Sequence, residues 1–397
     1  MLKHTVDCLF CQALLFFSLT LLLFITFKSM ASSDKAKSKY TVSLIGCGRI
    51  GFLLEQDPLR KKPCTHYGGL RAAGLKVNFA VDQDANRLDA FIKTAGINET
   101  HAFLKHTALF ERHVPEIAVI STWTPSHNEI AMDAVKSGVN CIVLEKPVSH
   151  NLQETKKLLT LCEETGTSII VNHERRFDSR YRKVKELIES GKIGELRSVH
   201  GKMLTGGYRG ASKLSEGGGP LLHDGTHLID ICRFFFGDVR SVEGEFQRFG
   251  RKRGYEDRAT AWLKTESGVD IFLEAGGAHK YFLFELEIYG TEGKILIGNG
   301  YEKLYASTKS KLYSNFRDLA EVPFPKYKND NCFINVYKEA ISILNGTQSA
   351  ATSSLLDGYK ALEIVHSIYY SAAHNRRNIK LPINPSKINL KKIFKLQ

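Results

Sequence analysis

Six consecutive residues near the start of the chain carry three glycines in the spacing G-x-G-x-x-G. They are Gly46, Cys47, Gly48, Arg49, Ile50 and Gly51. A short β-branched stretch at 40–45 precedes them, and we expect a helix to follow directly. In such a unit the first glycine allows a tight turn, the second lets a pyrophosphate approach the backbone, and the third lets the helix pack on the strand. The helix start offers free N–H groups to the phosphates. This context predicts a dinucleotide site formed by residues 46–51.

A second expected strand, at 75–81, ends in Asp82. A carboxylate at this position accepts hydrogen bonds from ribose hydroxyls and repels a 2′-phosphate, which favours NAD over NADP. The separation from Gly51 to Asp82 is 31 positions (82 minus 51), whereas about 20 is usual. We expect the extra residues to form a solvated excursion, or one that overhangs the site and presents residues 60–62 to an anionic group.

Ionisable side chains also lie at the end of the strand expected at 140–144 and near the start of the helix expected at 226–236. Lys146 follows the strand expected at 140–144, and ligands bind at the carboxyl ends of parallel strands. His227 lies near the start of an apolar helix expected at 226–236, and His223 precedes it by four residues. Two histidines at this spacing can share a helix face and hold zinc. No third ligand is evident, so we predict no metal site.

Strands and helices alternate through the first half of the chain. Further strands are expected at 116–121 and 168–172, and helices at 127–137 and 152–164. This alternation indicates right-handed βαβ units and a doubly wound parallel sheet, a Rossmann-type α/β fold. The second half contains stretches of period-2 alternation at 242–249 and 282–289, which indicate strands with one buried and one wetter face.

Four motifs in this order resemble the glucose–fructose oxidoreductase, inositol dehydrogenase and MocA family. They are GCGRIG at 46–51, STWTPSH at 121–127, EKP at 145–147 and GGGPLLHDGTHLID at 217–230. The resemblance covers about residues 40–385. It implies a Rossmann domain at 40–172 and a substrate-binding α/β domain at 173–385, whose open, mostly antiparallel sheet lines the substrate site. A hydrophobic segment at 1–29 and a basic tail at 386–397 flank them.

The resemblance also implies roles for single residues. Lys146 would contact the substrate hydroxyl, and His227 would be the acid/base. Relatives often carry an aspartate where this chain has His223, so the carboxylate that orients His227 is missing, replaced, or supplied by Asp224. Thr122, His127 and Glu145 would border the cofactor, while Arg176 and Tyr181 could reach the substrate. Asp230 is expected to be structural, with Arg233 as its partner.

These residues predict an NAD-dependent oxidoreductase that transfers a hydride between nicotinamide and a carbinol or keto carbon. The substrate would be a sugar, a cyclic polyol or a nucleotide sugar. Removing the alcohol proton needs a base that titrates near neutrality, which suits a histidine or a tuned lysine. Two alternatives stay open, because relatives include enzymes that cleave glycosides with no net redox change and sugar or cofactor sensors. The resemblance further implies a homo-oligomer.

Composition places few limits on the partners. The chain has 397 residues, of which 43% are hydrophobic and 24% charged, with a net charge of +13. The basic residues are dispersed, so we expect a generally basic surface that does not bind nucleic acid. The eight cysteines are also scattered, which indicates a reducing compartment such as the cytoplasm.

Residues 9–27 form an almost continuous apolar run of 19 residues, long enough to span a bilayer. Four lysines at 28–39 follow it, which would keep the larger part of the chain in the cytosol. A cleaved signal peptide is disfavoured, because it would export many free thiols. Translation from Met30 is the other reading, in which case the membrane is not a partner.

Overall fold

The computed structural model describes residues 39–206, 217–250 and 254–395. The apolar run at 9–27 therefore lies outside the described residues. Within the described ranges, the structure contains no helix with the length and apolar character needed to cross a membrane.

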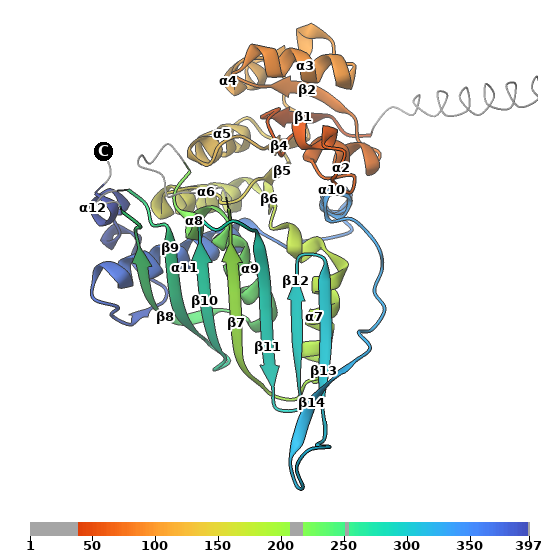
Figure 1. The fold of residues 1–397 in the computed structure, drawn as a ribbon. Helices are drawn as coiled ribbons and strands as arrows, with labels where there is room; N and C mark the ends of the chain where they lie inside the picture. Colours follow the sequence, from red (N-terminus) through yellow and green to blue (C-terminus); the bar gives the residue numbers. More distant parts are fainter. Residues whose placement is uncertain (1–38, 207–216, 251–253, 396–397) are drawn as a thin grey trace, which may run out of the picture. The chain divides into compact units, whose positions relative to one another are not determined.

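The amino-terminal half contains a six-stranded parallel sheet with the order β3-β2-β1-β4-β5-β6 (Figure 1). This confirms the predicted doubly wound fold. Its strands are β1 (Val42–Ile45), β2 (Val77–Val81), β3 (Ala102–Phe103), β4 (Ile117–Ile120), β5 (Cys141–Leu144) and β6 (Ser168–Val171). Because β1 lies between β2 and β4, the strand order reverses at β1 and β4, which is where such sheets bind dinucleotides.

Helices cover the sheet, and capping residues mark where two of them begin and end. They are α3 (Ala85–Ala95), α4 (His106–Phe110), α5 (Thr124–Lys136) and α6 (Leu152–Thr165), with the 3₁₀ turn η3 (Glu99–His101). Asp84 and Asn151 cap the starts of α3 and α6 through their side chains, and left-handed Gly96 and Gly166 end them.

The helix expected directly after Gly51 is split, which corrects the prediction. Only the 3₁₀ turn η2 (Leu53–Gln56) forms there, and α2 (His66–Ala72) begins ten residues later. The backbone N–H of His66 donates to the Ile50 carbonyl at 3.0 Å, and that of Tyr67 to the Gly51 carbonyl at 3.0 Å. The extra residues before Asp82 are therefore an excursion inserted within one helix, after which α2 resumes its hydrogen bonding.

The carboxyl-terminal half forms a nine-stranded sheet in the order β14-β13-β12-β11-β7-β10-β9-β8-β15. All neighbours pair antiparallel except β7 and β10, as expected for a mostly antiparallel sheet. The strands are β7 (Leu196–Leu204), β8 (Val239–Gln247), β9 (Arg258–Thr265), β10 (Asp270–Gly276), β11 (Leu283–Gly290), β12 (Gly293–Gly298), β13 (Tyr301–Lys309), β14 (Arg317–Val322) and β15 (Ile379–Lys380).

One face of this second sheet is covered by helices. These are α7 (Ser179–Glu189), α8 (Pro220–His223), α9 (Gly225–Phe236) and α11 (Leu355–Ala373) (Figure 1). A Cβ built on Gly201 of β7 would lie 2.9 Å from Leu228 of α9, and one on Gly244 of β8 would lie 2.6 Å from Ile368 of α11. Glycines on the strands therefore let these helices approach closely.

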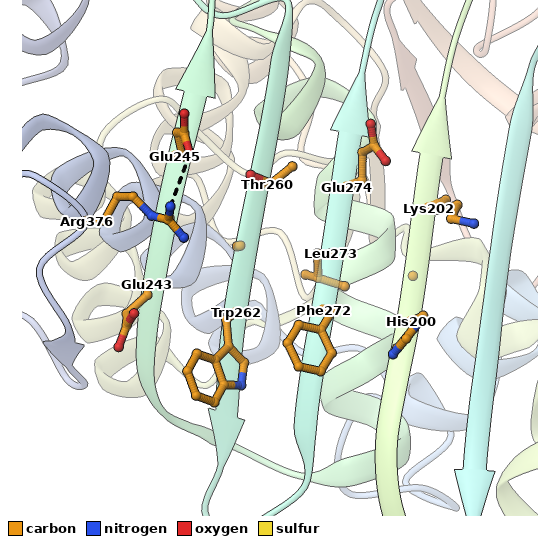
Figure 2. A pocket seen from close by; sticks show the side chains of 13 residues that line it. His200, Lys202, Glu243, Glu245, Thr260, Trp262, Phe272, Leu273, Glu274 and Arg376 are labelled. Carbon is orange, nitrogen blue, oxygen red and sulfur yellow. Dashed lines mark ion pairs between the residues drawn. The ribbon is translucent and has the colours of Figure 1, made fainter.

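The opposite face of the sheet is open (Figure 2). Trp262 and Phe272 stack there with ring centroids 5.9 Å apart, and their side chains are 42% and 43% exposed. Glu243 and Glu245 lie on the same face, beside Arg376. The wetter strand faces inferred from the sequence are therefore on the side away from α9.

The end of the chain returns to both halves. Helix α10 (Cys332–Leu344) packs against α2, where a Cβ on Gly69 would lie 2.8 Å from the Phe333 carbonyl. The turns η4 (Glu174–Phe177) and η6 (Pro385–Lys387) and the helix α12 (Leu390–Phe394) complete the fold. Phe394, in the segment expected to be a basic tail, is fully buried against Tyr255 and Tyr369.

Candidate active site

The three glycines after β1 meet three different requirements. Gly46 has a φ of +97°, which favours glycine, and a Cβ on Gly51 would lie 2.1 Å from the Gly46 carbonyl oxygen. Gly48 has neither constraint, because its φ is not in the left-handed region and a Cβ there would meet no protein atom within 4 Å. The protein itself does not require glycine at 48, whereas a pyrophosphate lying on the backbone would. The loop therefore fits a dinucleotide.

Asp82, directly after β2, holds this loop through its carboxylate. Oδ2 accepts the Cys47 N–H at 2.9 Å, and Oδ1 accepts the Asp84 N–H at 2.9 Å. The Arg87 guanidinium lies 3.1 Å from Oδ1 and is partly exposed. The Asp82 carboxylate, which we expect to bind the ribose, thus lies at the end of β2 beside the Arg87 guanidinium.

The segment after β4 is attached to the glycine loop on one side and to the end of β5 on the other. Ser121 Oγ donates to the Gly46 carbonyl at 2.7 Å. The buried His127 imidazole has Nδ1 2.8 Å from the Pro147 carbonyl and Nε2 2.9 Å from the Thr122 carbonyl. His127 therefore lies between two backbone carbonyls of the site; burial lowers its pKa, and the neutral ring donates its one N–H to one of them.

Glu145, the last residue before Lys146, lies in a buried polar network. Its Oε1 is 2.9 Å from His66 Nε2 and accepts the Asn172 amide at 2.6 Å, and His66 Nδ1 is 2.6 Å from the Tyr337 hydroxyl. Burial would raise the pKa of Glu145, but the interactions with His66 outweigh it and lower the pKa to about 2. Glu145 is thus ionised, and it is held in place by His66, the first residue of α2.

Lys146 lies at the carboxyl end of β5 and points to the junction of α8 and α9. Its Nζ donates to the His223 carbonyl at 3.1 Å and lies 3.6 Å from Asp224 Oδ1. Lys146 contacts the His223 carbonyl where the helix breaks at Asp224, since the His227 N–H bonds the Asp224 carbonyl there at 3.1 Å. Two segments 77 positions apart are joined in this way.

His223 and Asp224 act as a pair at this junction. His223 Nδ1 lies 2.9 Å from Asp224 Oδ1. Burial opposes ionisation of Asp224, but the hydrogen bond from His223 and the charge of Lys146 lower its pKa below the usual range. The carboxylate beside Lys146 is therefore that of Asp224. Among the described residues it does not bond His227 Nδ1, so its predicted role in orienting that imidazole stays a prediction.

His227 is 7% exposed, and its Nδ1 has no hydrogen-bond partner among the described residues. Its ring lies 6.2 Å from that of His173. Burial, together with the nearby charges of Lys146 and Arg175, lowers its pKa well below the usual range. The imidazole is neutral at physiological pH, which is the proton-accepting form, but the lowered pKa makes it a weaker base than the near-neutral one that the sequence predicted.

Two side chains expected to reach substrate are instead engaged in the interior. Arg176 binds Asp230 bidentately at 2.8 and 2.7 Å and also contacts Asp357 at 3.2 Å. Tyr181 is 1% exposed and lies beside Phe235 and Phe284. The partner expected for Asp230 was wrong, because Arg233 pairs with Asp238 and Asp357. Asp230 is almost fully buried, and its partner is Arg176 of η4, the turn that follows β6.

Arg175 was missed by the sequence analysis. Its guanidinium lies 3.6 Å from the centroid of the Phe284 ring and 3.3 Å from Glu174, and its charge acts on both His227 and Asp224. Arg176 was the arginine predicted to reach the substrate, but two adjacent arginines cannot be told apart by spacing alone. In η4 the Arg176 guanidinium binds Asp230, whereas the charge of Arg175 acts on His227.

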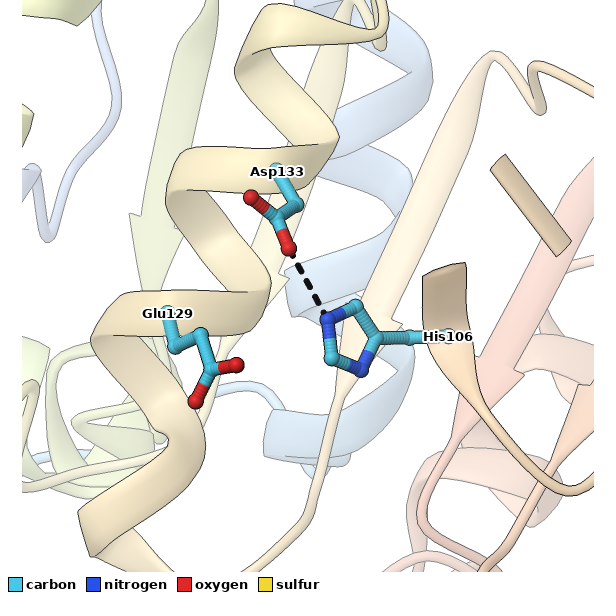
Figure 3. Close-up of side chains that lie close together, drawn as sticks. All are labelled: His106, Glu129 and Asp133. Atoms are coloured by element: carbon cyan, nitrogen blue, oxygen red, sulfur yellow. Dashed lines mark hydrogen bonds and ion pairs between the residues drawn. The ribbon is translucent and has the colours of Figure 1, made fainter. Parts of the chain in front are cut away.

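A second cluster lies away from these residues, between α4 and α5 (Figure 3). His106 Nε2 is 3.0 Å from Asp133, and Glu129, one turn earlier on α5, brings a second carboxylate close. Its donor types suit a metal, but an ion pair explains the His106–Asp133 contact equally well. Within the described ranges, the His223–His227 pair considered for zinc is not part of such a cluster.

Comparison with known families gives matches over most of the described chain. Residues 40–173 match the family model described as oxidoreductase family, NAD-binding Rossmann fold. Residues 181–296 match the model described as GFO/IDH/MocA C-terminal domain. These two segments hold the glycine loop, Lys146 and the α8–α9 junction.

Named relatives align over much of their length. D-apiose dehydrogenase of Rhizobium rhizogenes is 25% identical over 344 residues, covering 84% of this chain and 95% of that protein. scyllo-Inositol 2-dehydrogenase (NAD(+)) of Bacillus subtilis is 30% identical over 262 residues, covering 64% and 73%. The WlbA dehydrogenase of Bordetella pertussis, solved with NADH and UDP-GlcNAcA, is similar in fold, with a TM-score of 0.69 at 20% identity over 87% of this chain and 100% of that one.

Proposed function

Because the chain belongs to the GFO/IDH/MocA oxidoreductase family with an NAD-binding Rossmann fold, we propose that it is an NAD-dependent dehydrogenase of a sugar, a cyclic polyol or a nucleotide sugar. The observation that carries this proposal is the meeting of Lys146, Asp224 and His227 at the carboxyl edge of the same parallel sheet from which the glycine loop leaves. The named relatives act on an apiose and an inositol, which supports a polyhydroxylated substrate.

The roles follow from the geometry. Bound NAD would supply the hydride acceptor, held at Gly48 and Asp82. Lys146 is oriented by Asp224 and the His223 carbonyl, so its ammonium can donate to the substrate oxygen and stabilise negative charge there. His227, neutral at physiological pH, accepts the hydroxyl proton. We propose that Arg175, whose charge acts on both His227 and Asp224, contacts another substrate oxygen in place of Arg176 and Tyr181.

The test is NAD reduction by the purified protein with a panel of sugars, cyclic polyols and nucleotide sugars, followed at the nicotinamide absorbance band. We expect substrate-dependent NADH formation that falls at least about 100-fold in Lys146→Ala. The control Lys93→Ala removes an exposed lysine of α3 and should retain full activity. Glycoside cleavage with no net NADH would favour the transient-redox alternative, and NAD binding with no turnover would favour a sensor.

We also propose the division of the chain into a cofactor unit at 40–172 and a substrate unit at 173–385. The end of β6 at Val171 supports this boundary, while α10 of the second unit packs back onto α2 of the first. The six cysteines in the described residues are free thiols, which supports a reducing compartment such as the cytoplasm.

Association of two or more copies through the open sheet face is part of the same proposal. The exposed, stacked Trp262 and Phe272 at the centre of that face support it, because soluble proteins rarely leave such aromatic pairs uncovered. Light scattering should give a mass above one chain, and Phe272→Glu should reduce it. A monomer at micromolar concentration would contradict this part.

A further inference from the structure

Trp123 occupies an unusual place in the fold. It is the third residue after β4 and directly precedes α5, at the carboxyl edge of the sheet. β4 lies between β1, which leads into the glycine loop, and β5, which leads into Lys146. Despite this position at the crevice, the Trp123 side chain is 66% exposed.

The backbone on both sides of Trp123 is held firmly. Ser121 Oγ donates to the Gly46 carbonyl, and the buried His127 ring lies within hydrogen-bond distance of both the Thr122 and the Pro147 carbonyls. After it, Ser126 Oγ and N–H both donate to the Trp123 carbonyl, at 2.9 and 3.0 Å. The indole is therefore carried by a rigid segment between the glycine loop and the Lys146–Pro147 turn.

Two local preferences are broken at this one residue. The position before a helix favours Ser, Thr, Asp or Asn, whose side chains bond the first free N–H groups. Trp123 makes no such bond to α5. A large aromatic ring is also left in water, although burial would favour it. When a residue breaks local rules in a ligand crevice, the compensating interaction is commonly with the ligand.

We propose that the Trp123 indole covers the nicotinamide half of bound NAD and shields it from water. This inference rests on the proposed NAD binding. The crevice between β1 and β4 is where a dinucleotide crosses such a sheet, with its pyrophosphate at Gly48. The reacting ring must lie within reach of Lys146, which follows β5, and Trp123 follows β4, the strand between β1 and β5. Its flat apolar face suits the ring and the ribose carbons.

The chain contains two tryptophans, Trp123 and Trp262, which makes the test direct. In Trp262→Phe, all tryptophan emission comes from Trp123; in the matched control Trp123→Phe, it comes from Trp262 on the open sheet face. Each purified protein is titrated with NAD⁺, whose quenching of indole needs contact, and binding is followed in parallel by calorimetry. Acrylamide quenching measures the access of water to each indole.

NAD⁺ should quench Trp123 emission with the calorimetric Kd and reduce its acrylamide quenching several-fold, while Trp262 emission stays constant. Trp123→Ala should weaken NAD⁺ binding about tenfold with an unchanged melting temperature, and Trp123→Phe should lose less. If NAD⁺ binds by calorimetry but Trp123 emission and access do not change, the inference is overturned and the proposed function stands. If wild-type protein shows no NAD⁺ binding, the proposed function fails and this inference fails with it.

Discussion

Replacing Gly48 by alanine separates the needs of the fold from those of the ligand. A Cβ at 48 would meet no protein atom within 4 Å, and the backbone φ there suits any residue. The free energy of unfolding should therefore change by less than about 0.5 kcal/mol. The same methyl group would occupy the space that a pyrophosphate needs to reach the backbone N–H groups.

The expected loss in affinity follows from the hydrogen bonds displaced. A hydrogen bond to a charged group contributes about 1.5–3 kcal/mol, so losing one should raise the Kd for NADH roughly 10- to 150-fold. Gly51→Ala is the contrasting variant, because its Cβ would lie 2.1 Å from the Gly46 carbonyl oxygen. That overlap should lower the free energy of unfolding by about 1–3 kcal/mol.

Calorimetry with NADH and thermal unfolding of both variants measure these quantities. Gly48→Ala should melt with the wild type and bind poorly, whereas Gly51→Ala should melt earlier. Wild-type NADH affinity in a folded Gly48→Ala protein would refute the assignment of this loop to the pyrophosphate. A strongly destabilised Gly48→Ala protein would show that a methyl group at residue 48 overlaps with other atoms of the protein.

Two further substitutions test the charges. Asp82→Asn keeps an acceptor for the Cys47 N–H but removes the charge that pairs with Arg87. We expect the ratio of NADPH to NADH affinity to rise about tenfold or more, because a 2′-phosphate is no longer repelled and Arg87 is released. An unchanged ratio, measured by competitive titration, would contradict the assignment of Asp82 to the ribose. Burial raises the pKa of Glu256 to about 7 from 4.5. The folded state therefore keeps a proton that the unfolded state releases, and the free energy of unfolding should fall by about 3 kcal/mol as pH rises from about 4.5 to 7. Glu256→Gln should remove that slope in denaturant titrations across this range, and a slope equal to that of the wild type would argue against a buried, protonated Glu256.

Much of the fold could be predicted because it depends on short-range patterns. Glycine spacing, alternating strands and helices, and capping residues such as Asn151 depend on a few neighbouring residues. The excursion after Gly51 shows the limit of that reasoning. The unusual distance to Asp82 indicated extra residues, but only the bonds from His66 and Tyr67 back to residues 50 and 51 show that they interrupt one helix.

The sequence by itself determined a dinucleotide-type glycine loop, a doubly wound sheet and the placement of Lys146 at a strand end. Tertiary structure decided which side chains meet. The carboxylate that lies beside Lys146 is that of Asp224, and the His223 carbonyl accepts from the same ammonium, because the chain breaks its helix at that point. Arg176 turns inward to Asp230, and Arg175 stays beside His227. Pairings of this kind join segments distant in sequence, and their geometry is set by how the two halves pack, which no local spacing records.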